Sequence, residues 1–319
     1  MRIITVEEHF SMPGTSAVAS MGSAARALNV GAMDAGLVGG ADQMGLSIDD
    51  VRLAAMDASG IDVQVLSSPE SRPDRVRETN GYLHEAVRRY PGRFAGFASL
   101  PWADPESAAA ELKRCVGTLG FVGAFVANRV EDEFLDAERF DIVLKTAVDL
   151  GVPINIHPGL PPEAVRNASY GGLSPMVSAV FSSFGYGWHV DTGVHALHLI
   201  LSGVFDRYPP LQIILGHWGE LIPYYLPRLE DRMPPRVTGL KRRITDYFID
   251  NFYISPSGIF DYRQLQLCIQ MIGVDRILWA VDYPIMSLAD ARPFLENAPI
   301  PDADKNKIAY QNAERLLRI

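Results

Sequence analysis

Three of the seven histidines lie at the carboxyl ends of short apolar segments that we interpret as β-strands. They are His9 in VEEHF, His157 in NIHPG and His217 in ILGHWGE. Asp282 follows another such segment, in WAVDYP. A side chain at the carboxyl end of a barrel strand can point into the mouth, where barrel enzymes place their sites. We therefore expect these four ionisable groups to converge, although they are far apart in sequence.

The first segment offers two candidate metal ligands. Side chains two apart on a strand share a face, so Glu7 and His9 can both point inward while Glu8 points outward toward the helices. With His157 and Asp282 they form a mixed nitrogen and oxygen set, which suits Zn²⁺ or Mn²⁺ better than Mg²⁺. Four protein ligands plus a water or substrate atom would allow the metal to act as a Lewis acid.

Each residue of this set also has a purely structural interpretation. A single histidine after a strand is more often a hydrogen-bonded structural residue. Glu7 would serve equally as a salt-bridge partner at the barrel rim, and Asp282 as a turn residue before Tyr-Pro. The metal hypothesis rests on the joint occurrence of such residues at matched strand ends. We assign the histidines in helical patterns to packing or to the surface; these are His84, His195 and His198.

The segment GHWGE pairs an imidazole with a carboxylate. Gly216 and Gly219 allow a tight backbone, and Glu220 comes three residues after His217. A nearby carboxylate fixes the tautomer of a histidine and raises its basicity. The pair is typical of a general acid/base or of a group that orients substrate. A turn with a surface histidine–glutamate pair is the structural alternative.

Arg228 is a candidate for binding a substrate carboxylate. It comes eight residues after Glu220, about two helical turns, so both side chains can face the same side. Its guanidinium can hold a carboxylate in a bidentate manner. A structural ion pair with Glu230 or Asp231 is the alternative.

Eight short segments rich in Val, Ile and Phe recur along the chain, most of them followed by a helical pattern. Near-continuous apolar strands are typical of parallel sheets buried on both faces. Eight alternations favour a closed (β/α)8 barrel that forms a single domain over residues 1–319. A doubly wound open sheet is the runner-up, weakened by the absence of G-x-G-x-x-G after the first strand. The predicted strands are Ile3–Val6, Val63–Leu66, Phe94–Ser99, Val122–Val126, Pro153–Ile156, Leu211–Leu215, Phe252–Ser255 and Ile277–Val281.

The segments between these strands divide into helices and two long connections. Ser47–Gly60 carries a helix start signal, Ser47 with an acidic residue three positions on, and further helices are expected at Pro105–Gly117 and Asp136–Leu150. The long connections follow strands 1 and 5, and long loops in compact domains are usually lids or binding loops. Trp188 and His189 close the second, aromatic connection, and we expect them to line the substrate site. These connections are Ser11–Gly45 and Pro158–Trp188.

The composition is that of an ordinary globular protein with a large core. Of 319 residues 48% are hydrophobic and 21% charged, and the net charge of −9 argues against nucleic-acid binding, which needs a basic face. Cys115 and Cys268 lie in amphipathic patterns and are expected to be buried free thiols. We see no signal peptide and no apolar run long enough to cross a membrane, so we expect a cytoplasmic protein.

The candidate residues together resemble the motifs of the amidohydrolase-related metal-dependent decarboxylases. This family includes the 2,3-dihydroxybenzoate, γ-resorcylate, salicylate and 5-carboxyvanillate decarboxylases. The segments Arg93–Val126 and Val194–Glu220 are very similar to γ-resorcylate decarboxylase. The motifs that carry the resemblance are Glu7-x-His9, His157-Pro158, Gly216-His217-x-Gly219-Glu220 and Asp282-x-Pro284.

The resemblance implies a (β/α)8 barrel with one Zn²⁺ or Mn²⁺ ion in a homodimer or homotetramer. His217 matches the family's active-site histidine, and Arg228 stands where relatives place an arginine near the substrate carboxylate. Hydrolase branches carry His-x-His on strand 1 and often a bridging Lys or Glu on strand 4, both absent here, which favours one metal and decarboxylation. The implied ligands are Glu7, His9, His157 and Asp282.

The function that we expect is non-oxidative decarboxylation of an aromatic carboxylic acid with an adjacent hydroxyl group. Asp282 would carry the proton to the ring, His217 with Glu220 would polarise the hydroxyl, and Arg228 would hold the carboxylate. Two rivals are a lactone or amide hydrolase that uses metal-bound water, and a barrel kept only for binding. Ile285 and Met286 depart from the decarboxylases, which tend to have an aromatic residue and then Glu there.

Overall fold

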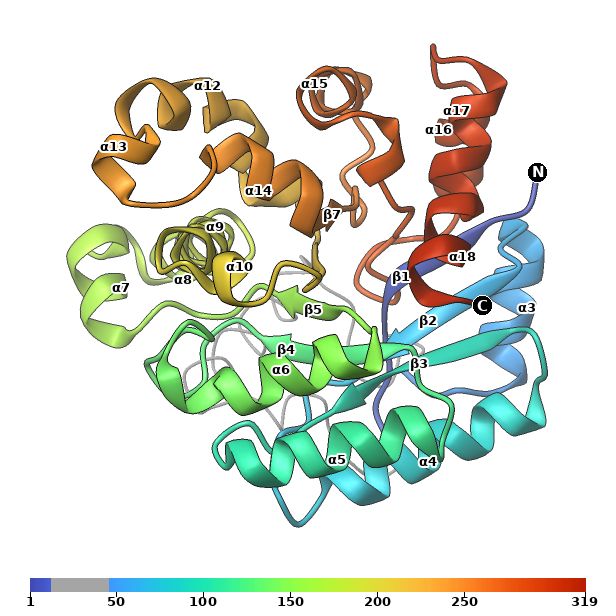
Figure 1. Cartoon of the computed structure of the whole chain (residues 1–319). Helices are drawn as coiled ribbons and strands as arrows, with labels where there is room; N and C mark the ends of the chain where they lie inside the picture. The colour runs from blue at the N-terminus through green and yellow to red at the C-terminus, as the bar shows by residue number, and fades with distance from the viewer. Residues whose placement is uncertain (13–45) are drawn as a thin grey trace.

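Seven parallel β-strands form one curled sheet in the computed structural model, which describes residues 1–12 and 46–319 (Figure 1). Strands that follow one another in sequence are neighbours in the sheet. Because they are parallel, each connection runs from the carboxyl end of one strand back to the amino end of the next. The first seven predicted strands are confirmed, with β6 shorter than expected. The strands are β1 Ile4–His9, β2 Val63–Ser67, β3 Phe94–Ser99, β4 Gly123–Ala127, β5 Ile154–His157, β6 Ile213–Leu215 and β7 Phe252–Ile254.

Residues 277–283, where the eighth strand was predicted, run between β7 and β1 without forming a regular strand. On one side the backbone N–H of Leu278 donates to the carbonyl of Ile254 at 2.8 Å. On the other side the N–H of Asp282 donates to the carbonyl of Glu7 at 3.0 Å. The segment therefore connects the two edges of the sheet, while the complete eight-stranded barrel stays a prediction.

Helices surround the curled sheet, as expected for strands buried on both faces. Helix α4 packs on β3, and α5 packs on both β3 and β4 (Figure 1). The helices are α3 Asp50–Ser59, α4 Val76–Arg89, α5 Pro105–Gly117, α6 Asp141–Leu150, α7 Glu163–Tyr170, α8 Pro175–Ser182, α9 Gly187–Leu201, α10 Val204–Arg207, α11 His217–Glu220, α12 Ile222–Arg232, α13 Pro235–Thr238, α14 Ile244–Asn251, α15 Tyr262–Ile272, α16 Ala291–Glu296, α17 Asp302–Asn306 and α18 Asn312–Leu317.

The start of α3 differs from the prediction. Its N-cap is Asp49, whose carboxylate accepts hydrogen bonds from the N–H groups of Val51 and Arg52 at 3.0 and 3.1 Å. The capping box predicted from Ser47 is therefore wrong, because a carboxylate two residues later takes the same role. The predicted end is confirmed, since Gly60 closes α3 with the left-handed backbone that glycine adopts without steric cost.

The predicted long connection at residues 158–188 contains regular structure. It forms α7 and α8, and Trp188 and His189 belong to the first turn of α9. The other predicted connection, Ser11–Gly45, falls almost entirely on residues 13–45, which lie outside the described residues.

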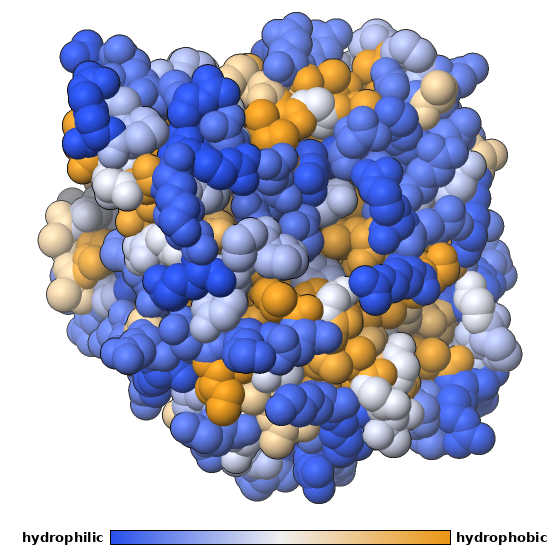
Figure 2. All heavy atoms as spheres, viewed as in Figure 1, coloured by the Kyte–Doolittle hydropathy of each residue, from blue (hydrophilic) through white to orange (hydrophobic). Residues whose placement is uncertain are grey.

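The buried side chains form two groups on the two sides of the sheet. The inner group fills the curl of the sheet with residues such as Val6, Phe97 and Tyr253, and the larger outer group packs the strands against the helices. Cys115 and Cys268 are buried free thiols, as predicted. On the face in Figure 2 hydrophilic residues dominate and hydrophobic ones reach the surface in separate patches. Among the described helices none has the length and apolar character needed to span a bilayer.

A buried polar network fixes the beginning of α9 to the end of β4. Asp191 of α9 accepts two hydrogen bonds from the guanidinium of Arg129 at 2.7 and 2.8 Å, and one from the amide of Asn128 at 2.7 Å. Asn128 also accepts from Nδ1 of His195 at 3.1 Å, while Nε2 of that ring accepts from the N–H of Leu135 at 3.0 Å. Burial lowers the pKa of His195 to about 3, so the imidazole is neutral. The predicted packing role of His195 is confirmed.

Replacement of Asp191 by alanine tests this network. It would leave the guanidinium of Arg129, whose side chain is only 16% exposed, without its carboxylate. We expect the free energy of unfolding to fall by about 3 kcal/mol, because breaking a buried pair leaves an uncompensated charge. Urea unfolding measures the change. Asp149→Ala, which removes an exposed ion pair with Lys145, is the matched control and should cost less than about 1 kcal/mol. Equal losses in both variants would contradict the network's role.

Candidate metal centre and active site

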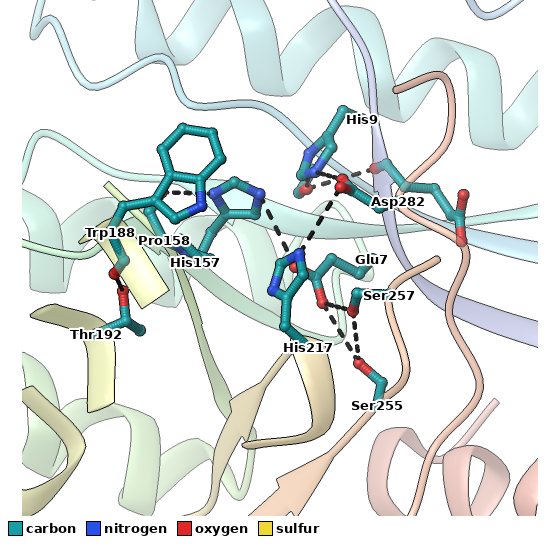
Figure 3. Close-up of polar contacts among 12 residues, drawn as sticks. Glu7, His9, His157, Pro158, Trp188, Thr192, His217, Ser255, Ser257 and Asp282 are labelled. Atoms are coloured by element: carbon teal, nitrogen blue, oxygen red, sulfur yellow. Dashed lines mark hydrogen bonds and ion pairs between the residues drawn. The ribbon is translucent and has the colours of Figure 1, made fainter. Parts of the chain in front are cut away.

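A β-bulge in β1 directs Glu7 into the curl of the sheet. Thr5 pairs with Gln64 and Glu8 with Leu66, so β1 advances three residues while β2 advances two. Val6 belongs to the inner core, yet the next residue, Glu7, also points inward (Figure 3). The extra residue thus brings the carboxylate to the side on which His9 lies.

The carboxylate of Glu7 is completely buried and only half satisfied. Its Oε2 accepts hydrogen bonds from the hydroxyl of Ser255, at 3.3 Å, and from that of Ser257. Its Oε1 has no hydrogen-bond partner in the described structure. Gly216 makes room for the group, since a Cβ there would lie 2.4 Å from Oε2. Burial raises the pKa of Glu7, and the positive charge of His217 opposes the rise.

His157, at the end of β5, presents an unprotonated nitrogen to Glu7. Its Nδ1–H donates to the carbonyl of Pro158 at 2.8 Å, which leaves the lone pair of Nε2 facing Oε1 of Glu7 at 3.8 Å. Burial, reinforced by the charge of His9, lowers the pKa of His157 to about 3. A neutral imidazole whose other nitrogen is fixed by a carbonyl is the usual state of a metal-binding histidine.

His9 contacts Asp282, so the first strand and the segment that follows Ile277 meet in this site. Nε2 of His9 lies 3.0 Å from Oδ1 of Asp282, and its Nδ1 lies 3.1 Å from the hydroxyl of Ser67. Burial alone would lower the pKa of His9, but the hydrogen bond and charge of Asp282 raise it. The pKa of Asp282 is lowered despite its burial, because the neighbouring His217 and His9 stabilise its negative charge. Asp282 is therefore a carboxylate in the described structure.

His217 lies in a turn of unusual backbone conformation. Five consecutive residues, His217 to Leu221, have φ between 47° and 74°, a region that only glycine enters at low cost. Trp218 anchors the turn, because its backbone N–H donates to the carbonyl of Ser255 and its indole N–H to that of Ile259, both at 2.7 Å. Strained backbone persists only where its surroundings hold it, and it concentrates at functional sites.

Glu220 holds two histidines at once. It accepts from Nδ1 of His217 at 2.9 Å and from Nδ1 of His189 at 2.8 Å. The indole N–H of Trp188 donates to Nε2 of His189 at 2.9 Å. The far nitrogen of His217 lies 3.8 Å from Oδ2 of Asp282. The five side chains thus form one chain of polar contacts that ends at the candidate metal ligands.

This chain sets the protonation of its members. Burial would raise the pKa of Glu220, but His217 and His189 outweigh it and lower the pKa. Burial would likewise lower the pKa of His217, but Glu220 and Asp282 raise it well above its ordinary value. His217 is therefore the group that holds a proton next to Asp282.

Two groups of side chains in the described structure have ligand atoms within 4.8 Å of one another. In the group of His189, His217 and Glu220, both carboxylate oxygens already accept hydrogen bonds. In the other group a buried carboxylate oxygen without a partner faces two histidines, which is costly unless a cation is bound. This second group fits a divalent metal ion, and Asp282 adjoins it through His9. It consists of Glu7, His9 and His157.

The predicted residues are therefore mostly brought together. The four proposed ligands and His217 converge from β1, β5, α11 and the segment after Ile277 (Figure 3). Glu220 joins them through its hydrogen bond with His217. Arg228 does not join them: its side chain is exposed on α12 and has no contact with these groups in the described structure. The alternative ion pairs are not formed either, since Glu230 pairs with Arg243 and Asp231 with Arg232.

Glu8 has a role that the sequence did not reveal. Its side chain accepts hydrogen bonds from the backbone N–H groups of Val281, at 2.9 Å, and Tyr283, at 3.0 Å. These residues flank Asp282. Burial raises the pKa of Glu8 to about 8, and the two N–H donors oppose the rise. The buried Arg52 supports the same strand end, because it donates to the carbonyl of His9.

Comparison with known proteins decides the family. Residues 38–319 match the amidohydrolase family profile. The chain belongs to the amidohydrolase family. It is 38% identical over 296 residues to a γ-resorcylate decarboxylase of Polaromonas sp. (strain JS666), an alignment that covers 86% of this chain and 88% of the relative.

Solved structures agree with this assignment. A dihydroxybenzoic acid decarboxylase of Polaromonas sp. JS666, with bound manganese and the inhibitor 2-nitroresorcinol, is 35% identical with a TM-score of 0.83, covering 99% of this chain and 97% of its own. A 5-carboxyvanillate decarboxylase of Sphingomonas paucimobilis is 29% identical with a TM-score of 0.86, covering 100% and 99%. The family prediction is confirmed. The relatives support a metal-dependent decarboxylase over the predicted hydrolase alternative.

Replacement of Glu8 by glutamine tests its positioning of Asp282. An amide has one acceptor and one donor, so one of the two backbone N–H groups would face an N–H₂. We expect the affinity for Mn²⁺ to fall by about 10- to 100-fold, the range typical of residues that orient metal ligands. Calorimetric titration of metal-free protein with Mn²⁺ measures it.

The exposed Glu78 of α4 provides the control, Glu78→Gln, which should bind Mn²⁺ as the unmodified protein does. Circular dichroism establishes that the Glu8 variant is folded. A folded Glu8→Gln protein with undiminished Mn²⁺ affinity would show that Glu8 does not act on the metal centre.

Proposed function

We propose that this chain catalyses non-oxidative decarboxylation of a hydroxy-substituted aromatic carboxylic acid with one Zn²⁺ or Mn²⁺ ion. The observation that carries the proposal is the unpartnered Oε1 of buried Glu7, which faces His157 and lies near the contact of Asp282 with His217. The substrates named for the relatives support the aromatic acid, and manganese is the ion in the Polaromonas structure. We further propose that residues 277–283 complete a (β/α)8 barrel, and that the chain forms one domain.

Glu7, His9, His157 and Asp282 would hold the ion. When bound, the ion supplies a positive charge that holds the substrate carboxylate together with the neighbouring hydroxyl oxygen. Two carboxylates and two imidazoles suit either Zn²⁺ or Mn²⁺. Ser255 and Ser257 orient Glu7 from the far side, so its free oxygen faces the site.

His217 and Asp282 would move the proton. His217 holds a proton on Nε2, and Asp282 stands next to it as a carboxylate with a lowered pKa. The proton passes to Asp282 and then to the ring carbon that bears the carboxylate. The bond to the carboxylate then breaks, its electron pair restores the aromatic ring, and CO₂ leaves.

Glu220, His189 and Trp188 would keep His217 in the state that this step needs. Glu220 fixes the Nδ1–H of His217, so the other nitrogen faces Asp282. A fixed carboxylate beside an imidazole stabilises the protonated ring and its orientation. His189 satisfies the second oxygen of Glu220, and its ring lies 4.5 Å from that of His217. The predicted contacts of Trp188 and His189 with substrate remain part of the proposal.

Replacement of His217 by asparagine separates the reaction from metal binding. We expect kcat for CO₂ release from 2,6-dihydroxybenzoate to fall by about 10²- to 10⁴-fold, the usual contribution of a general acid. The bound manganese should remain near one ion per chain, because His217 is not a proposed ligand. CO₂ release and the product mass measure the reaction, and elemental analysis measures the metal.

His198→Asn, on the exposed side of α9, is the control and should retain full activity. A manganese-loaded protein that releases no CO₂ from any hydroxybenzoate but adds water to a lactone or amide would refute the proposed function. Metal-free protein would refute the proposed site instead.

We also propose that the chain forms a homodimer or homotetramer, with exposed apolar side chains of α8 and, separately, of the beginning of α12 contributing to its contacts. Large exposed apolar patches on globular proteins commonly mark interfaces. The exposed apolar residues of α8 and of the beginning of α12 are Met176, Val177, Phe181, Leu221, Tyr224 and Tyr225.

Arg228 lies on the exposed side of α12, and its role in carboxylate binding stays a prediction.

Charged residues in this surface should break the oligomer. We expect Val177→Lys and Tyr224→Lys each to lower the mass measured by light scattering after size-exclusion chromatography, because a buried unpaired charge is costly. Val51→Lys is the control, on a side chain of α3 that is 71% exposed and outside the patch. A monomeric unmodified protein at micromolar concentration would contradict the proposal.

A further inference from the structure

A cavity of about 320 Å³ lies at the end of the sheet opposite the candidate active site. Pro153 and Gln212, which immediately precede β5 and β6, line it, as do residues of α6 and α18. The proposed ligands stand in the carboxyl-terminal half of β1, at the end of β5 and in the segment that follows Ile277. The cavity is therefore separate from the metal centre, and nothing in the proposed reaction uses it.

Arginines dominate the polar lining of this cavity. The three are Arg276, Arg315 and Arg318, and no acidic side chain is among the described residues that line it. None of the three forms an ion pair within the part of the chain that the structure describes. This arrangement stands out in a chain with 38 acidic and 29 basic residues, where most other arginines are paired with carboxylates.

One of the lining side chains, that of Tyr253, is built into the core. Tyr253 of β7 is 6% exposed and belongs to the inner core, yet its hydroxyl has no hydrogen-bond partner among the described residues. Arg276 stacks over its ring, with the guanidinium carbon 4.8 Å from the ring centroid. Gln212 accepts a hydrogen bond from Arg276 at 3.1 Å and so fixes the guanidinium. One side of the cavity is therefore fixed by contacts within the protein, and the hydroxyl of Tyr253 on that side can donate a hydrogen bond to a ligand.

The other two arginines approach from α18. Arg315 donates to the carbonyl of Asp275 at 2.8 Å and to the amide oxygen of Asn312 at 2.9 Å, both neutral acceptors. Arg318 lies against Gly151, where a Cβ would be 2.8 Å from its terminal nitrogen. The positive charges of both side chains therefore remain uncompensated. Both are exposed at the mouth, so a ligand can reach them.

We propose that this cavity binds a multiply charged oxyanion, either inorganic phosphate or the phosphate group of a small metabolite. Guanidinium groups match the oxygens of phosphate in a bidentate manner, and a tyrosine hydroxyl supplies a further donor. The volume exceeds that of phosphate alone, which leaves room for an attached organic group. The bound anion joins α18 to β7 and α6, at the end of the barrel that governs stability rather than catalysis.

Binding is measured by titration calorimetry on the manganese-loaded protein at constant ionic strength. Inorganic phosphate and glycerol 3-phosphate are the two probes, and acetate is the singly charged comparison. We expect the double variant R315A/R318A to bind the preferred probe at least about 10-fold more weakly while retaining its rate of decarboxylation. The probe that binds more tightly identifies free phosphate or a phosphate ester as the ligand.

Arg236 of α13 is also an exposed arginine without an ion pair in the described structure, so its replacement is a matched control. R236A should bind the probes as the unmodified protein does. Tyr253→Phe should weaken binding without changing the net charge. Equal affinities of the unmodified protein and R315A/R318A, or no binding of either probe, would overturn the proposal. Inhibition of decarboxylation by phosphate that persists in R315A/R318A reports binding at the metal centre and counts against the cavity.

Discussion

The buried carboxylate of Glu7 is the constraint on which the rest of the site depends. A carboxylate in the centre of a folded protein is costly unless it is paired and hydrogen-bonded. Ser255 and Ser257 satisfy one oxygen, and the absence of a side chain at Gly216 allows the group to fit. The second oxygen has no partner among the described residues and faces His157. A cation between these groups would compensate the negative charge of Glu7. It would also be coordinated by the lone pair of the neutral imidazole.

The strained turn after β6 also serves to hold a side chain of the site in place. Four non-glycine residues between His217 and Leu221 adopt the left-handed backbone that L-amino acids avoid. The indole and backbone of Trp218 hold the turn against β7, so the cost is met by contacts formed elsewhere. The turn allows His217 to face Asp282 with one nitrogen and Glu220 with the other. Strain here thus sets the orientation of one imidazole.

The sequence was sufficient for the elements and for the convergence of the site. Seven of the eight predicted strands were confirmed because continuous apolar runs have few other interpretations, and the places of His157 and Asp282 in the site followed from their positions at strand ends. Local patterns failed for the exact position of a helix cap, for the structure of a long connection and for a contact with a distant segment. Asp49 rather than Ser47 caps α3, residues 158–188 form helices, and Glu8 bonds to a segment more than 270 residues away. Ser255 is the last residue of a predicted strand and Ser257 lies just beyond it, the same kind of position that singled out His157 and Asp282.

The bulge in β1 explains how two adjacent glutamates take different roles. Without the extra residue Glu7 would lie on the opposite side from Val6, as simple alternation requires. With it, Glu7 turns inward to the histidines, and Glu8 reaches the backbone on either side of Asp282. One short stretch of strand therefore supplies two proposed ligands and also holds the segment that carries another. Because the backbone of β1 and the side chain of Glu8 both form hydrogen bonds with residues 281–283, the position of Asp282 depends on this one strand.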